Sequence, residues 1–383
     1  MTHLTPVPEQ IRKLHETESA SLAGNYIDFP ANDFVWEDLR RYAVVLIGLG
    51  YSDAEPHLNN VRESFYSLHI HHSEFLKIID LGNVLVDRGD NLAANKIEFV
   101  LKEIIKYNVF IIPFGKSPVY LNYCYNALKT IDDSATITYI SNSASVGSAD
   151  DNLSRQNHLA YLLGELDNKL FSLNILGYQL YQTNPQSIEL LNNLYCQTMR
   201  LGSLRNDFKS VEPTVRDSDL LAINMSAVRQ CDAPASLQPS PNGFYAEEAC
   251  QLSRYGGISD RLVIGSIFGF DLEKDLNGST SQLVAQLIWH FIDGYIARKN
   301  DNPLKNVNRF KKYIVDMGAP SRQLIFHYSE FSERWWMEVP RNDSATSLLI
   351  ACSYDDYRSA CNHEVPLRWV WFHQKLSQKN NID

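Results

Sequence analysis

Short apolar runs rich in β-branched residues alternate with longer segments of helical periodicity from residue 42 to about residue 298. In the segment 91–108, for example, Ile97, Val100 and Ile104 fall on one face of a helix. Alternation of this kind predicts an α/β fold with a mostly parallel sheet and helices on both of its faces. The expected strands are 42–50, 77–84, 109–115, 135–141, 170–178, 219–225 and 261–270, and the expected helices lie around Val61–Phe75 and near 91–108, 118–130, 152–166, 185–198 and 278–300.

The segment 278–300 has the clearest helical pattern. Leu283, Leu287 and Phe291 belong to a wide apolar stripe that would face the sheet. Ser279 and Gln282 have the spacing of a capping box. The sequence therefore predicts that these two side chains cap the start of this helix.

Three regions of the chain differ in composition and pattern. Residues 1–35 are polar and contain prolines, which predicts an arm packed on the surface. Residues 36–305 carry the alternating pattern of the α/β domain. Residues 306–383 are rich in tryptophan and short β-like runs, which predicts a small appended α+β module. Within it, Trp335 and Trp336 are interpreted as core aromatics, with an exposed anchor for a partner as the alternative.

Composition narrows the classes of function. The chain is 44% hydrophobic and 21% charged, as expected of a globular protein. A formal net charge of −10 supplies no basic field, so neither nucleic acid nor a membrane surface is an expected partner. No run of about 18 apolar residues predicts a membrane span, and the first residues lack the apolar core of a signal peptide. Together with six scattered cysteines, interpreted as reduced thiols, this predicts a cytoplasmic protein.

Polar side chains follow the expected strands where a parallel sheet usually places its ligand sites. Asn224 and Ser226 lie at the end of one expected strand, the serine-rich segment 141–145 ends another, and Lys116 and Ser117 end a third. These side chains are mostly amides and hydroxyls, where carboxylates would bind a metal or move a proton more effectively.

Between residues 42 and 298 the chain resembles the ureohydrolase superfamily, which includes arginase, agmatinase and formimidoylglutamase. The likeness is carried by the stretches "IGLGYSDAEPHLNNVRESFYSL", "IIDLGNV", "FGKS" and "FGFDLEKDLNGSTSQLVAQLIWHF". It implies a single three-layer α/β/α domain, hydrolysis of guanidino or formimino groups by water between two manganese ions, and assembly into trimers or hexamers. The later "ERWWMEVP" resembles a bacterial branch of the family with a C-terminal extension.

The same resemblance places the family's metal motifs on this sequence, and none of them keeps its ligands. A late substrate-side glutamate falls near Gly269. The vacated metal-ligand positions are Ser117 in the Gly-Gly-Asp-His motif, Ser141, Ser143 and Ser145 in the Asp-Ala-His-x-Asp motif, and Asn224 and Ser226 in the Ser-x-Asp-x-Asp motif.

Loss of these ligands changes the expected function. Manganese prefers carboxylates with a few imidazoles, and two divalent ions without anionic ligands would carry uncompensated charge in a partly buried cleft. The sequence therefore predicts a degenerate ureohydrolase without metal or catalytic residues, acting as a binding or assembly protein. One alternative is a C–N hydrolase of linear amidines that holds manganese by displaced ligands.

A second alternative is a sensor of a small polar ligand. The vacated positions, with Lys116, Asn142 and Gly269, would converge on one cleft rich in hydrogen-bonding groups. The partner is then either that ligand or an unidentified protein, for which the C-terminal module is the candidate contact surface. The family resemblance also implies a homo-oligomer.

Four other clusters allow a metal or nucleophile hypothesis, and a structural role is favoured in each. A helix could bring together pairs of residues in "HIHHSEF", but this segment lies away from the expected cleft. The cysteine–histidine spacing in the C-terminal module matches no established zinc pattern. Nothing in the sequence pairs the thiol of Cys231 with a base. The clusters are His69, His71, His72 and Glu74; Asp150 and Asp151; Cys352, Cys361 and His363; and Cys231.

Overall fold

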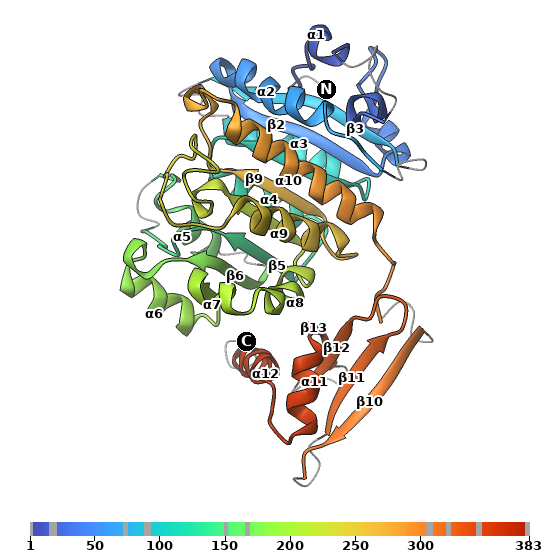
Figure 1. Ribbon diagram of the computed structural model, residues 1–383, viewed down its shortest axis with the longest axis vertical. Coiled ribbons are helices and arrows are strands. Elements are labelled where there is room, and N and C mark those ends of the chain that lie inside the picture. Colours follow the sequence, from blue (N-terminus) through green and yellow to red (C-terminus); the bar gives the residue numbers. More distant parts are fainter. Residues whose placement is uncertain are drawn as a thin grey trace.

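A sheet of nine parallel strands runs through the larger part of the protein (Figure 1). The computed structural model describes residues 3–14, 21–71, 76–87, 93–148, 152–164, 169–303, 309–318, 323–341 and 347–379. The strand order is β1-β3-β2-β4-β9-β8-β5-β6-β7. The strands are β1 (Ile27–Asp28), β2 (Val44–Tyr51), β3 (Ile78–Val86), β4 (Phe110–Gly115), β5 (Ala135–Ile140), β6 (Leu170–Tyr178), β7 (Gln197–Arg200), β8 (Leu220–Asn224) and β9 (Ile264–Phe268).

Helices cover both faces of this sheet because successive strand residues point to opposite sides. In β2, Val44 and Leu46 belong to one apolar core, and Val45 and Ile47 belong to the other. The first core is completed by α2 (Glu55–Tyr66), α7 (Leu201–Asn206), α8 (Glu212–Arg216), α9 (Ala246–Ile258) and α10 (Ser279–Ile296), and the second by α3 (Ala93–Ile105), α4 (Tyr120–Leu128), α5 (His158–Gly164) and α6 (Pro185–Asn193). The three-layer α/β/α prediction is confirmed.

Three predicted helices differ from the observed ones, and one of them, expected near 152–166, begins only at His158 as α5. The helix expected around Val61–Phe75 lies earlier in the chain, as α2. It ends at Tyr66 because the backbone groups of Leu68 and Ile70 instead pair with those of residues 21–23. The helix expected near 185–198 ends at Asn193, and the chain turns through Tyr195, at φ +50°, into strand β7.

The capping box predicted for α10 is wrong. The helix begins one residue after Gly278, which has a φ of +69°. Asp275 caps it instead, because its carboxylate accepts hydrogen bonds from the backbone N–H groups of Thr280 and Ser281 at 3.0 and 2.7 Å. None of the helices in the described part of the chain is long and apolar enough to cross a membrane.

The first 35 residues contribute to the main core. Thr5 pairs with Asn83 in β3, and the two-residue strand β1 extends the sheet beyond β3. Val7, Ile11 and Ile27 are buried in the core that contains α10. The short helix α1 (Glu9–Arg12) lies in the same segment.

The C-terminal region forms a separate antiparallel sheet with two helices (Figure 1). Trp335 and Trp336 are both buried, so their interpretation as core residues is confirmed. The guanidinium of Arg216 from α8 stacks on Trp336 and donates to the carbonyl oxygens of Trp335 and Cys352. The elements are β10 (Phe310–Asp316), β11 (Gln323–Ser329), β12 (Trp335–Pro340), β13 (Ser347–Cys352), α11 (Tyr354–Cys361) and α12 (Leu367–Lys379).

Candidate functional site

The polar positions that follow the strands gather at one edge of the sheet. Strands β4, β9, β8 and β5 are consecutive neighbours in the strand order. Since all four are parallel, their carboxyl ends open to the same side. Ser117 follows β4, Gly269 follows β9, Asn224 ends β8, and the segment 141–145 follows β5.

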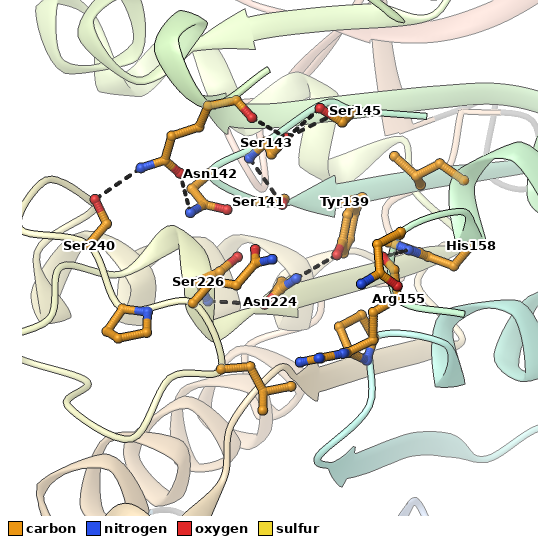
Figure 2. Close-up of a pocket in the computed structure, with 17 residues that line it drawn as sticks. Tyr139, Ser141, Asn142, Ser143, Ser145, Arg155, His158, Asn224, Ser226 and Ser240 are labelled. Atoms are coloured by element: carbon orange, nitrogen blue, oxygen red, sulfur yellow. Dashed lines mark hydrogen bonds between the residues drawn. The ribbon is translucent and has the colours of Figure 1, made fainter. Parts of the chain in front are cut away.

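A cavity of about 530 Å³ opens at this edge (Figure 2). Six of the sequence-predicted residues line it, which are five of the vacated ligand positions and Asn142. Figure 2 shows Ser240 and Asn142 toward one side of the cavity and Arg155 and His158 toward the other. The lining comprises Pro118, Tyr139, Ser141, Asn142, Ser143, Ser145, Arg155, Gln156, His158, Leu159, Gln182, Asn224, Ser226, Leu237, Gln238, Pro239 and Ser240.

Three other predicted residues lie outside the lining and support its floor. The ammonium of Lys116 forms an ion pair with Asp271 at 2.8 Å, and its carbonyl accepts from the N–H of Gly269. Gly269 has a φ of +85°, and a Cβ there would collide with the side-chain oxygen of Asn224. The hydroxyl of Ser117 accepts from the N–H of Val119, just before α4.

Hydrogen bonds fix most of the cavity wall. Asn224 accepts from the N–H of Ser226 at 3.0 Å and donates to the hydroxyl of Tyr139 at 2.6 Å. Burial raises the pKa of Tyr139 to about 12, although its hydrogen bonds with Asn224 and Ser141 oppose the shift. The phenol is therefore neutral at physiological pH.

Gln182 joins the other side of the wall. Its side-chain oxygen accepts from the amide of Asn142, and its side-chain nitrogen donates to Ser240 at 3.1 Å. Its backbone carbonyl accepts from the hydroxyl of Ser143, whose oxygen also lies 3.0 Å from the hydroxyl of Ser145. The wall is thus a connected network of neutral groups.

Three buried polar atoms of the lining have no hydrogen-bond partner among the described residues: Asn142 Oδ1, Ser226 Oγ and His158 Nε2. The three residues are 3%, 1% and 6% exposed. Buried polar atoms are usually paired; nine side-chain atoms of the described residues are not, and three of these belong to the lining of this one cavity. All three atoms are themselves almost fully enclosed.

His158 is neutral, and its tautomer is fixed. Burial lowers its pKa to about 4, although a hydrogen bond with the Arg155 carbonyl opposes the shift. Its Nδ1 lies 2.9 Å from that oxygen. Because a carbonyl oxygen only accepts, Nδ1 carries the proton and the unpartnered Nε2 is an acceptor.

Several solved structures share this architecture. Formimidoylglutamase from Bacillus subtilis matches with a TM-score of 0.63 at 14% identity, over 72% of this chain and 91% of its own. Formiminoglutamase from Trypanosoma cruzi with Mn2+2 matches with a TM-score of 0.61 at 15% identity, over 70% and 97%. Proclavaminate amidino hydrolase from Streptomyces clavuligerus matches with a TM-score of 0.59 at 17% identity, over 67% and 93%.

The chain has the ureohydrolase fold. No protein-family model and no curated protein matches its sequence. At identities of 14–17% the likeness establishes the ureohydrolase fold and leaves the chemistry to be argued from the site.

The donors at the strand ends of this ureohydrolase fold do not suit manganese. None of the described residues in the cavity lining is a carboxylate, and its one imidazole is buried and neutral. Within the described residues, no group of three or more His, Cys, Asp or Glu side chains is placed to hold a metal ion. Hydroxyl and amide groups leave the charge of a hard divalent cation uncompensated.

The other candidate clusters gain no support as sites. His69 lies beyond the end of α2, and its Nδ1 is 2.6 Å from the hydroxyl of Ser21, so His69 is not part of the predicted helix. Cys352 is buried, whereas Cys361 and Cys231 are exposed, and all three are free thiols. His72 and Glu74, like Asp150 and Asp151, lie outside the described residues.

Eleven residues of the cavity lining were not expected from the sequence, and five of them carry the polar contacts or the charge described above. Their polar side chains come from segments that no metal motif marks, and long-range contacts bring them to the strand ends. Ser240, for example, bonds to a glutamine 58 positions earlier. The only signal in the sequence is polarity, which many surface residues share. These five residues are Tyr139, Arg155, His158, Gln182 and Ser240.

Proposed function

We propose that this protein binds a small polar molecule in the strand-end cavity and does not carry out dimanganese hydrolysis. The observation that carries the proposal is the donor set. Apart from Arg155, the described residues of the lining are neutral, and three of their buried atoms lack partners in the described part of the chain. Such a lining suits hydrogen bonds to a ligand better than coordination of divalent cations.

The unpartnered atoms give the proposal its energetic basis. A buried polar atom without a hydrogen bond costs about 1–3 kcal/mol. A ligand that bonds to Asn142 Oδ1, Ser226 Oγ and His158 Nε2 recovers this cost, so the cavity is more stable when it is filled.

Thermal unfolding of the full chain in a library of small polar compounds tests this proposal directly. We expect at least one compound to raise the melting temperature of the wild type and to lose this effect in Ser226→Phe, which places a ring in the cavity. As a control, Ser210→Phe changes a half-buried serine outside the lining and should keep the response. Absence of any stabilising compound would contradict the proposal.

Metal content separates this function from its main alternative, hydrolysis of linear amidines with displaced ligands. After incubation with excess manganese and desalting, we expect well below one equivalent by mass spectrometry, and no urea or formamide from guanidino or formimino substrates. Close to two equivalents together with turnover would overturn the proposal. The paired variants Asp150→Asn and Asp151→Asn would then show whether those carboxylates hold the metal.

A further inference from the structure

We propose that the cavity selects ligands with two features, an uncharged head that donates hydrogen bonds and a carboxylate that pairs with Arg155. Ureido and carboxamide acids are the chemical class that combines them. This inference rests on the proposed function and specifies its ligand. It follows from whether each polar group around the cavity donates or accepts hydrogen bonds, and from its charge.

Residues on both sides of the cavity offer acceptors. His158 Nε2 is an acceptor because its Nδ1 proton is engaged by a carbonyl oxygen. Asn142 Oδ1 is also an acceptor, because the amide nitrogen of that side chain donates to Gln182. Ser226 Oγ can act either way. A head group that fits these atoms must supply N–H or O–H donors.

The charge of that head is limited by what surrounds it. No acidic side chain stands among the described residues of the lining. A guanidinium or amidinium would therefore be desolvated without a counter-charge, which is costly for an ionised group. An amide or urea presents the same N–H groups without that cost.

Arg155 supplies the one formal charge of the described lining. It forms no ion pair with the described residues, and Figure 2 shows its side chain extending into the cavity. Its guanidinium can bind a carboxylate through two parallel hydrogen bonds. Asn142 lies toward the opposite side of the cavity from Arg155 (Figure 2), so a molecule that reaches from Asn142 to Arg155 would carry donors at one end and its anion at the other.

Three matched probes test each feature: 4-ureidobutanoate, 4-guanidinobutanoate and butylurea. Isothermal titration of the full chain should show that 4-ureidobutanoate binds about tenfold or more tightly than either of the others. Arg155→Gln should remove the tighter binding of 4-ureidobutanoate relative to butylurea and should leave the affinity for butylurea unchanged. As a control, Arg358→Gln alters an arginine that is exposed and remote in sequence, and should change none of the affinities.

The outcomes separate the ligand class from the broader function. Equal or tighter binding of 4-guanidinobutanoate, or an unchanged affinity in Arg155→Gln, would overturn the class. If the guanidino acid binds and Ser226→Phe abolishes that binding, the cavity remains a binding site and only its selectivity is wrong. If none of the probes binds, the class is overturned, and the thermal screen decides separately whether the cavity binds any compound.

Discussion

The hydroxyl of Ser226 offers the sharpest test of whether the cavity is built for a ligand. Its side chain is 1% exposed and has no hydrogen-bond partner among the described residues. Replacement by alanine removes the oxygen and keeps the Cβ in place. Because no described bond is lost and a buried polar atom is removed, Ser226→Ala should stabilise the ligand-free protein by about 1–3 kcal/mol.

Ser218 is the matched control. It is equally buried, at 0% exposure, but its hydroxyl donates to the carbonyl of Thr214 and accepts from the hydroxyl of Thr138. Ser218→Ala breaks both bonds and leaves their partners buried. We expect it to destabilise the protein by about 1–3 kcal/mol.

Thermal unfolding at pH 7 without added ligand distinguishes the two variants. For a chain of 383 residues, 1 kcal/mol corresponds to a shift of roughly 1.2 °C. The melting temperature of Ser226→Ala should therefore rise by about 1–4 °C and that of Ser218→Ala should fall by a similar amount. If the melting temperature of Ser226→Ala falls as far as that of Ser218→Ala, the hydroxyl of Ser226 has a structural role and the argument from unpartnered atoms fails.

Three further predictions concern other parts of the structure. The pKa of His158 is about 4 in the folded protein against 6.5 unfolded, so the unfolded chain binds the extra proton first as the pH falls through 6.5. Urea titrations at pH 7 and 4.5 should therefore show an additional loss of about 2–3 kcal/mol in the wild type that is absent from His158→Gln. Arg216→Ala should lower the free energy of unfolding by about 2–4 kcal/mol, because it removes both hydrogen bonds and the stacking contact to the C-terminal module. The exposed control Arg358→Ala should change it by less than about 0.5 kcal/mol, and equal losses would contradict the assigned contact. Gly269→Ala should lower the melting temperature, because it combines a positive φ with a collision, whereas Gly202→Ala, in a helix with nothing within 4 Å of its Cβ, should leave it unchanged or raise it.

The sequence predicted the frame of the site well, and the reason is geometric. Strands β4, β5, β8 and β9 were recognisable as apolar runs, and parallel strands must end at one edge of a sheet. The convergence of Asn142, Asn224 and Ser226 followed from this rule. Where local pairing decided the structure, as beyond α2 and after α6, periodicity alone predicted the wrong boundary.

The other half of the cavity lay beyond prediction because it depends on tertiary contacts. Arg155 and His158 come from the loop and first turn of a short helix whose own pattern says only that one face is apolar. The role of His158 depends on burial and on a carbonyl oxygen three residues before it. Neither the burial of this side chain nor the position of that carbonyl oxygen can be predicted from the spacing of residue types.

The distribution of bonded and unbonded groups argues against simple drift of a former metal site. Drift would leave side chains that either face solvent or find new partners within the protein. Instead, Asn224 and Gln182 each use both ends of their amides to fix neighbouring groups, while Asn142 Oδ1, Ser226 Oγ and His158 Nε2 stay buried and unpartnered within the described structure. Six other buried polar atoms of the described residues also lack partners, but three of the nine gather at this one cavity. An ordered wall with such atoms is what preorganisation for a ligand requires, because the binding energy is then not spent on ordering the site.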